Sequence, residues 1–341
     1  MSDGLKYNKK MSDEEFSKLI TLPLDEKIKL SEAIIVEFME NIDCSDDKKV
    51  YISCSFGKDS VVLVDLVRKL YPKIPIIFSD TGLEYKGIYK VKEKYENVIT
   101  VNPLRTMEEH IEKEGYILPI GKAKSKSLRR ARRWIKEEKW DNGTFKLLSG
   151  KGEYGKGSLF NHSSALPYII APFPISERCD DFLKKKPLDK YIKEHNFKYS
   201  FNGITYDESR MRRATLLRDG FNKMSSKTSL KSRPMGHWNT NDVLKYICDN
   251  DLEISDSYGE IIKNKDGYDV TLFKRSGCYC CPCGCHMEKY PNRYQILYYY
   301  DYDAWTYTMY DLGFKKILDY FDVPYYPNDV VDDVTLDKYV G

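Results

Sequence analysis

Residues 50–67 read VYISCSFGKDSVVLVDLV. The β-branched and aromatic run Val50–Ile52 predicts a strand, and the apolar run Val61–Val67 predicts a helix. The loop between them is short and polar, so its backbone N–H groups can approach an anion at the helix N-terminus, where the helix dipole favours negative charge. Lys58 adds a cation. The stretch therefore predicts a phosphate site between a strand and a helix, and an ordinary turn is the alternative if the loop is taken alone.

A second small polar loop, Asp80-Thr81-Gly82, follows the next expected strand, Ile74–Ser79. The first loop, SFGKDS, resembles the pyrophosphate loop of the adenine nucleotide α-hydrolase superfamily, which includes ATP pyrophosphatases and phosphoadenosine phosphosulfate (PAPS) reductases. The second loop resembles that superfamily's second loop, and no Walker phosphate loop surrounds the first. The resemblance implies that Lys58 and Asp80 handle a pyrophosphate and its Mg²⁺. It also implies that an adenine nucleotide, either ATP or a sulfonucleotide, is bound by Ser55, Phe56, Gly57, Lys58, Asp59, Ser60, Asp80, Thr81 and Gly82.

Expected strands and helices alternate along the first half of the chain, which predicts an α/β fold with a doubly wound, mostly parallel sheet. Such sheets bind ligands at the carboxyl ends of their strands, where both loops fall. Composition and motifs divide the chain into an N-terminal arm (1–23), a nucleotide-binding α/β domain (24–255) and a cysteine-rich, tyrosine-rich helical region (256–341). A glycine-rich insertion at about 141–165 is expected to be weakly structured.

The composition is that of a globular protein, with 341 residues of which 41% are hydrophobic and 31% charged. No apolar run approaches the ~20 residues of a membrane span. The N-terminus lacks the apolar core of a signal peptide, so a cytoplasmic protein without a membrane partner is expected. The formal net charge of +3 does not by itself indicate a nucleic-acid partner.

Residues 122–139 form a basic block, which contains nine Lys or Arg residues and only two Glu residues. Such a block could meet the phosphate backbone of tRNA or DNA. A solvated helix face near an anionic small-molecule site is the alternative. The acceptor of the reaction is therefore left open between a nucleic acid and a small molecule.

The end of a strand expected at Tyr199–Thr205 also resembles the PAPS reductase group. There Gly203-Ile204 is followed by an acidic-Ser-x-x-Arg stretch. Gly203 is expected to contact the bound nucleotide. Arg210 and Arg213 lie one helical turn apart and could grip a phosphate or sulfate, because the guanidinium fork matches two oxygens. The resemblance adds Arg210 to the catalytic residues, and ordinary surface charges are the alternative reading of this pair.

Five of the nine cysteines fall between Cys278 and Cys285, which indicates a metal or redox site in a reducing compartment. The segment matches the family's Gly-Cys-x-x-Cys-Pro-x-Gly pattern. Where relatives carry a cluster, two adjacent cysteines earlier in the chain complete it, but here that pair reads Cys179-Asp180. Three states remain open: an iron–sulfur cluster, a zinc site, and free thiols that carry or relay sulfur. The expected ligands are Cys179, Cys278, Cys281, Cys283 and Cys285.

Three functions from different classes remain open. PAPS reductases of the assimilatory type end in a catalytic cysteine on a mobile tail, whereas no cysteine follows Cys285 here. We therefore expect ATP to be cleaved at the α-phosphate, so that an adenylated acceptor can receive sulfur from a donor protein. The first alternative is reduction of a sulfonucleotide to sulfite, with one thiol of residues 278–285 as the nucleophile. The second is a non-catalytic nucleotide-binding redox sensor.

Overall fold

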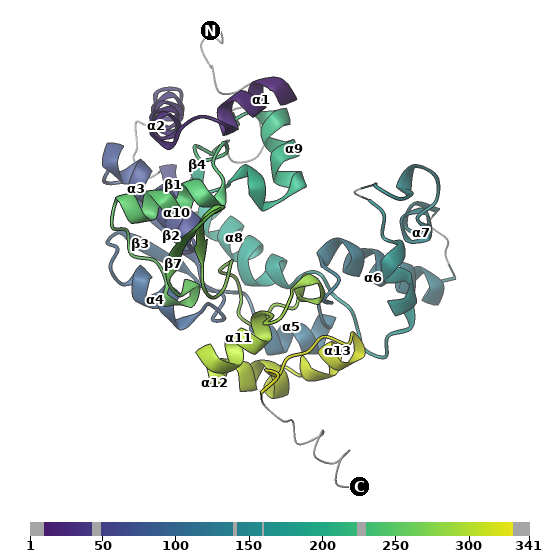
Figure 1. Cartoon of the computed structure of the whole chain (residues 1–341). Helices are drawn as coiled ribbons and strands as arrows, with labels where there is room; N and C mark the ends of the chain where they lie inside the picture. Colours follow the sequence, from purple (N-terminus) through teal and green to yellow (C-terminus); the bar gives the residue numbers. More distant parts are fainter. Residues whose placement is uncertain (1–9, 43–48, 139–141, 159, 224–229, 330–341) are drawn as a thin grey trace. The chain divides into compact units, whose positions relative to one another are not determined.

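The computed structural model describes residues 10–42, 49–138, 142–158, 160–223 and 230–329 (Figure 1). The chain divides into two compact units, each built from segments that are separated in the sequence. The first unit takes residues 1–80, 84–102 and 187–277, and the second takes residues 81–83, 103–186 and 278–341. The chain therefore passes from one unit to the other five times, after Asp80, Leu83, Asn102, Lys186 and Gly277.

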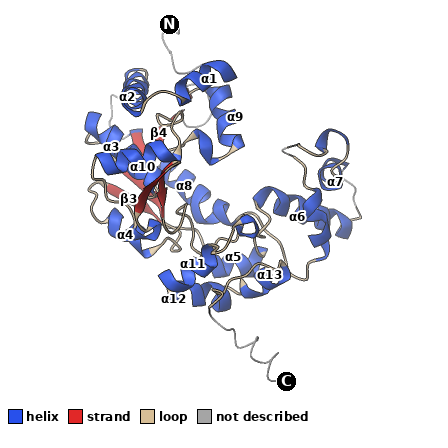
Figure 2. Cartoon of the chain, viewed as in Figure 1, coloured by secondary structure: helices blue, strands red, loops and turns tan. Residues whose placement is uncertain are grey.

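A six-stranded sheet forms the centre of the first unit, with the strand order β3-β2-β1-β4-β6-β5. The strands are drawn in red in Figure 2. Neighbouring strands are parallel except for β5, which is antiparallel to β6. The predicted doubly wound, mostly parallel α/β sheet is therefore confirmed. The strands are β1 (Val50–Ser53), β2 (Ile76–Ser79), β3 (Val98–Val101), β4 (Tyr199–Asn202), β5 (Asn222–Lys223) and β6 (Leu230–Ser232).

Helices and one antiparallel hairpin complete the first unit. Helix α3 packs against β1 and β4, and α2 and α10 pack against α3. The hairpin of β7 (Ile261–Asn264) and β8 (Gly267–Val270) lies against α10. The helices are α1 (Asp13–Ile20), α2 (Leu24–Glu40), α3 (Lys58–Leu70), α4 (Lys86–Lys92), α8 (Lys186–Glu194), α9 (Arg210–Asp219) and α10 (Thr240–Asp249), with short 3₁₀ turns η5 (Tyr206–Glu208) and η6 (Asp256–Tyr258).

Local capping explains where several of these helices begin. The side chains of Ser12 and Asn239 each accept a hydrogen bond from the third N–H of α1 and α10, and the acidic side chain at that third position accepts one from the N–H of the cap residue. This reciprocal arrangement satisfies two otherwise unpaired donors. Farther along, α1 packs its buried Phe16 against Ile34 of α2 and Phe221, so that burial of apolar surface fixes the helix.

The second unit is mainly helical. It contains α5 (Met107–Glu114), α6 (Lys122–Lys136), α7 (Asn142–Ser149), η2 (Gly152–Tyr154), η3 (Ser163–Ile170), η4 (Asp181–Lys185), η7 (Cys285–Met287), α11 (Arg293–Tyr300), α12 (Tyr302–Thr306), η8 (Tyr307–Asp311) and α13 (Lys315–Tyr320). Residues 141–165 were expected to be weakly structured from their glycine content, yet they include α7, which packs against η3 and α6. Within the described parts of the chain, no helix is long and apolar enough to cross a membrane.

Candidate functional site

The loop between β1 and α3 carries the first candidate site. Gly57 precedes α3 in an extended conformation, and no side chain caps the helix. Instead, the Ser60 hydroxyl donates to the Gly57 carbonyl at 2.9 Å and accepts from the Ser55 N–H at 3.3 Å. Phe56 has φ of +52° and buries its ring against Phe78. The aromatic side chain thus anchors the loop in the core. The positive end of the helix dipole lies at the first turn of α3 and favours an anion there.

Gly57 is required because other parts of the first unit close on it. A methyl group at this position would overlap the Ser276 hydroxyl and would lie 2.9 Å from the Tyr258 hydroxyl. The same Tyr258 hydroxyl accepts a hydrogen bond from the Lys58 N–H at 3.0 Å. Burial raises the pKa of Tyr258 to about 12, so this hydroxyl stays protonated at neutral pH. Tyr258 and Ser276 were not predicted, because they lie some 200 residues from the loop in the sequence.

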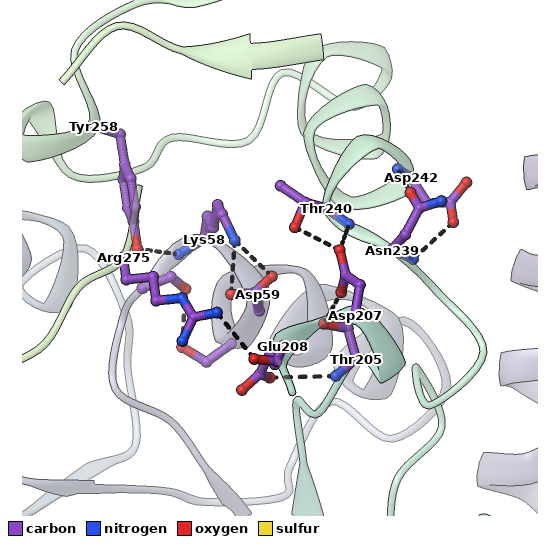
Figure 3. A network of polar contacts seen from close by, with 12 residues as sticks. Lys58, Asp59, Thr205, Asp207, Glu208, Asn239, Thr240, Asp242, Tyr258 and Arg275 are labelled. Carbon is purple, nitrogen blue, oxygen red and sulfur yellow. Dashed lines mark hydrogen bonds and ion pairs between the residues drawn. The ribbon is translucent and has the colours of Figure 1, made fainter. Parts of the chain in front are cut away.

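Lys58 lies at the start of α3 with its side chain almost fully buried. Its ammonium group is 2.9 Å from both carboxylate oxygens of Asp59 (Figure 3). Phosphate oxygens would have to compete with, or join, this neighbouring carboxylate. Because the pair is largely desolvated, loss of the lysine would leave Asp59 uncompensated.

A second group of polar contacts, around Glu208, is drawn in Figure 3 beside the Lys58–Asp59 pair. Arg275 donates to the Glu208 carbonyl at 3.0 Å, and Arg212 forms an ion pair with the Glu208 carboxylate at 2.9 Å. Burial raises the pKa of Glu208, the nearby Asp59 charge raises it further, and the two arginines lower it. Arg275 was not predicted as a site residue. The only sequence feature that could have indicated Arg275 is its position three residues before Cys278.

The other residues expected at the nucleotide fall into two groups. Gly203 approaches the start of α3, where a methyl group on it would lie 3.1 Å from the Asp59 carbonyl oxygen. Arg210 is exposed at the start of α9, whereas Arg213 forms an ion pair with Asp13 at 3.1 Å. Arg213 also lies over the Phe16 ring. The structure therefore places Gly203 beside the loop, but Arg210 and Arg213 do not form one anion-binding site.

The second loop divides between the two units. In the first unit, the Asp80 carboxylate accepts a hydrogen bond from the Tyr89 hydroxyl at 2.7 Å. Burial, assisted by this carboxylate, raises the pKa of Tyr89. In the second unit, the Thr81 hydroxyl lies 3.5 Å from the Cys278 sulfur. Gly82 has φ of +73° with open space around its Cα, which suits a glycine at an exposed turn.

The cysteine segment of the second unit is held by backbone contacts. The Cys281 N–H donates to the Cys278 carbonyl at 3.0 Å, which closes a tight turn. Arg293 donates to the Cys281 carbonyl at 2.9 Å, and the Tyr294 hydroxyl donates to the Cys280 carbonyl at 3.0 Å. These bonds fix the chain around the sulfurs by tertiary contacts rather than by local sequence.

Burial dominates the electrostatics of the thiols. It raises the pKa values of Cys179 and Cys285 to about 12, and it also raises those of Cys280 and Cys281. Neighbouring sulfurs at positions 278 and 281 raise the pKa of Cys179 further, while the Lys122 ammonium lowers it. Cys179 thus lies in the same electrostatic neighbourhood as the segment, although 99 residues separate it from Cys278 in the sequence.

All eight cysteines in the described part of the chain are free. Among the described residues, no group of three or more His, Cys, Asp or Glu side chains is arranged so that it could hold a metal ion. The side chains as placed therefore do not form a ligand set for zinc or an iron–sulfur cluster. The five expected ligands remain a prediction.

The basic block forms α6, and much of its charge is used within the second unit. Arg129 forms two bonds to the Glu177 carboxylate at 2.8 and 2.7 Å, and Lys122 pairs with Asp180 at 3.1 Å. Arg132 donates to backbone carbonyls of residues 168–173. The charges that stay exposed are Lys126, Arg130, Arg133 and Lys136.

Comparisons with known proteins agree with this arrangement. A family model described as phosphoadenosine phosphosulfate reductase domain matches residues 49–144 and 153–283, which include both loops and four of the five clustered cysteines. An adenosine 5′-phosphosulfate reductase of Bacillus velezensis is 44% identical over 75 residues, which are 20% of this chain and 32% of the relative. The chain thus spans about a third of the length of the first curated relatives that it matches.

Longer but weaker similarities cover more of the chain. An adenosine 5′-phosphosulfate reductase of Lysinibacillus sphaericus is 23% identical over 210 residues, covering 60% of this chain and 65% of the relative. A crystal structure of phosphoadenylyl-sulfate reductase from Candida auris, in a phosphate complex, is 16% identical and covers 73% of this chain and 92% of its own, with a TM-score of 0.38.

Proposed function

Because the chain belongs to the phosphoadenosine phosphosulfate reductase domain family, we propose that it is an enzyme that binds an adenine nucleotide at the β1–α3 loop and reduces a nucleotide 5′-phosphosulfate to sulfite. The observation that carries the proposal is the extent of the family match, which takes in the phosphate loop and the cysteine segment together. Two relatives whose names state adenosine 5′-phosphosulfate reduction are 44% and 43% identical to this chain over 75 residues.

The loop supplies the binding chemistry. The start of α3 presents backbone N–H groups and the positive end of the helix dipole to an anion. The Ser55 hydroxyl is on the exposed side of the loop, and the buried ammonium of Lys58 adds a charge-assisted donor. Gly57 lets the backbone approach the ligand closely because it carries no Cβ. Together these groups hold the phosphate end of a nucleotide and leave the outer sulfuryl group for attack.

The reaction requires two thiols or one thiol and an external dithiol. In the first step, a cysteine thiolate attacks the sulfur of the phosphosulfate, so that an S–S bond forms and the sulfur–oxygen bond to the phosphate breaks. The nucleoside phosphate leaves with the bonding electron pair. In the second step, another thiolate attacks the cysteine sulfur, and sulfite leaves as a disulfide forms. The candidates for the first thiol are Cys278, Cys280, Cys281, Cys283 and Cys285.

The test is an anaerobic assay of the full chain with adenosine 5′-phosphosulfate or PAPS and a dithiol reductant. We expect sulfite and the corresponding nucleotide in equal amounts, with loss of turnover in a variant that has all five cysteines of residues 278–285 replaced by serine. Cys248→Ser is the matched control, because this exposed cysteine lies on α10 outside both candidate regions. Sulfite production by the five-serine variant would contradict the proposed thiol step.

A second candidate is cleavage of ATP at the α-phosphate with release of pyrophosphate and adenylation of an acceptor. The observation that favours it is Lys58 in the loop. The acceptor is then a small molecule or a nucleic acid that meets the exposed cations of α6, and a donor protein supplies the sulfur. Exchange of labelled pyrophosphate into MgATP, lost in Lys58→Ala, would support this candidate over reduction.

A further inference from the structure

Helix α6 of the second unit has two different faces. One face packs within the unit, where Leu128 and Ala131 are fully buried and the helix lies against α7 and η3. On the opposite face, Lys126, Arg130 and Arg133 are exposed. These three residues follow one another at spacings of four and three, so their side chains form a single line along the helix. We call these three residues the basic row of α6.

The cations that flank the basic row are held inside the unit. Arg129 forms two hydrogen bonds to the Glu177 carboxylate, at 2.8 and 2.7 Å. Arg132 donates to the backbone carbonyls of Ile169 and Phe173 at 2.6 and 2.8 Å. These contacts fix the rotation of α6 about its own axis, so that the basic row faces solvent.

The basic row has little counter-charge of its own. Within the part of the chain that the structure describes, its one ion pair joins Arg133 to Glu137, at 4.0 Å between two exposed side chains. Such an exposed pair is weak, because water screens both charges. No acidic residue lies within α6 itself. The exposed face of α6 therefore carries a concentrated positive potential, which favours an anionic partner.

The segments that follow the basic row extend this charge. Helix α7 packs against α6, and η2 packs against α7 (Figure 1). The further exposed cations of α6, α7 and the segment after α7 are Lys136, Lys146, Lys151 and Lys156. The exposed acids among the described residues of 122–158 are Glu137, Glu138 and Glu153. Exposed cations thus outnumber exposed acids by seven to three in this part of the unit, so a partner with many negative charges fits it better than a single small anion.

A basic helix can also bind an anionic membrane, but α6 lacks the apolar surface for it. Membrane-bound helices insert an apolar face beside the basic one. In α6 that face is occupied, because Leu128 and Ala131 are buried in the unit. Ile135 is 52% exposed, but it lies nine residues after Lys126 and therefore on the side of the helix opposite the basic row. The basic row suits a partner that is bound through charge alone.

We propose that the basic row of α6 binds the phosphate backbone of duplex DNA. Lys126 and Arg133 are ~10.5 Å apart along the helix axis, close to the ~12 Å width of the major groove of B-form DNA. The ends of the row can therefore meet phosphates on both edges of that groove. Double-stranded RNA has a deep, narrow major groove that excludes side chains, and single strands bind mainly by stacking on aromatic side chains, which the row lacks.

The test measures binding of the full chain to DNA without any nucleotide, so its result does not depend on the proposed function. A short fluorescent duplex of mixed sequence is titrated at several NaCl concentrations, and the affinity is read from anisotropy. Each phosphate contact contributes about −0.9 to the slope of log affinity against log salt, so we expect a slope of about −3 or steeper for the wild type.

The combined variant Lys126→Gln, Arg130→Gln and Arg133→Gln removes the whole row. We expect its affinity at low salt to fall about 10-fold or more and its slope to become less steep by about 3, because three phosphate contacts are lost. The three side chains are exposed, so their loss should leave folding intact. Arg130→Gln alone gives a second test, in which the slope changes by about 0.9.

A matched control removes the same charge elsewhere in the second unit. It combines Lys113→Gln, Lys289→Gln and Lys316→Gln, three exposed lysines outside α6 and α7. This variant should keep the wild-type slope. Absence of DNA binding, or an unchanged slope in the variant without the row, would overturn the proposal. Tighter binding to double-stranded RNA, to single-stranded DNA or to phosphatidylserine vesicles, lost with the row, would overturn duplex DNA as the partner.

Discussion

The nucleotide loop and the cysteine segment are both short and both end near glycines, yet they are built in opposite ways. The loop is defined largely by its own sequence: β1 ends at Ser53, Phe56 takes a positive φ, and α3 begins at Lys58 without a cap from the side chain before it. The cysteine segment takes its shape from residues elsewhere in its unit, since Arg293 and Tyr294 bond its carbonyls. An anion site needs backbone donors that local structure provides, whereas a group of thiols needs neighbours that only the tertiary fold supplies.

The strongest test of this contrast is Gly57→Ala. The added methyl overlaps the Ser276 hydroxyl and approaches Tyr258, so the loop must move. We expect nucleotide binding to fall roughly 100-fold and the free energy of unfolding to fall by about 1–3 kcal/mol. Calorimetry with AMP and chemical denaturation measure the two effects.

Gly277→Ala is the matched control for this variant, because its methyl meets no atom within 4 Å. Adding Ser276→Gly to Gly57→Ala should restore part of the binding. No recovery in the double variant would mean that the loop tolerates no Cβ for a reason other than Ser276.

The next largest effect is expected from Lys58→Met. The change removes the buried cation beside Asp59 and keeps most of the side-chain volume. Loss of a charge-assisted contact to phosphate lowers nucleotide affinity about 10-fold to 100-fold. Lys69→Met on the exposed part of the same helix is the control, and it should bind AMP as the wild type does. Equal affinity in Lys58→Met would show that backbone groups alone hold the phosphate.

Arg293→Gln probes the cysteine segment without touching the loop. It removes the donor to the Cys281 carbonyl and the ion pair with Glu288. We expect sulfite formation to fall about 10-fold because the thiols lose their fixed spacing, while AMP affinity stays unchanged. A parallel loss of AMP affinity would mean that the two regions do not act separately.

The smallest effect concerns Cys54, a thiol of the nucleotide loop outside the cysteine segment. Burial raises its pKa to about 11, whereas an unfolded cysteine titrates near 8.5. Above that lower value the unfolded chain releases the proton and the folded chain does not, so stability is lost as the pH rises from about 9 towards 11.

Cys54→Ala should lose less stability than the wild type in this range, by roughly 1 kcal/mol between pH 9 and pH 10. Denaturation midpoints at pH 7, 9 and 10 measure the difference. Cys248→Ala serves as the control, because that thiol is exposed and its loss should change the pH profile little. Parallel profiles for Cys54→Ala and the wild type would indicate that Cys54 ionises in the folded protein.

Much of the fold could be predicted from the periodicity of apolar residues and from the positions of turn-forming residues. The strands β1, β2 and β4 and the helix α3 lie where their apolar runs predict them. The hairpin β7–β8 and the antiparallel β5–β6 pair were missed, because short strands such as Asn222–Lys223 carry no periodic signal. Likewise, α7 forms in a glycine-rich stretch because contacts with η3 and α6 outweigh its low helix propensity.

The sequence by itself determined the phosphate loop, since the donors, the glycine and the lysine are consecutive residues whose geometry is set by a strand, a turn and a helix dipole. Only the tertiary structure decided what surrounds it. Tyr258 and Ser276 close on Gly57, and Gly203 approaches the start of α3. These contacts join residues far apart in the chain. Their energies come from burial and desolvation, which exist only after the chain has packed.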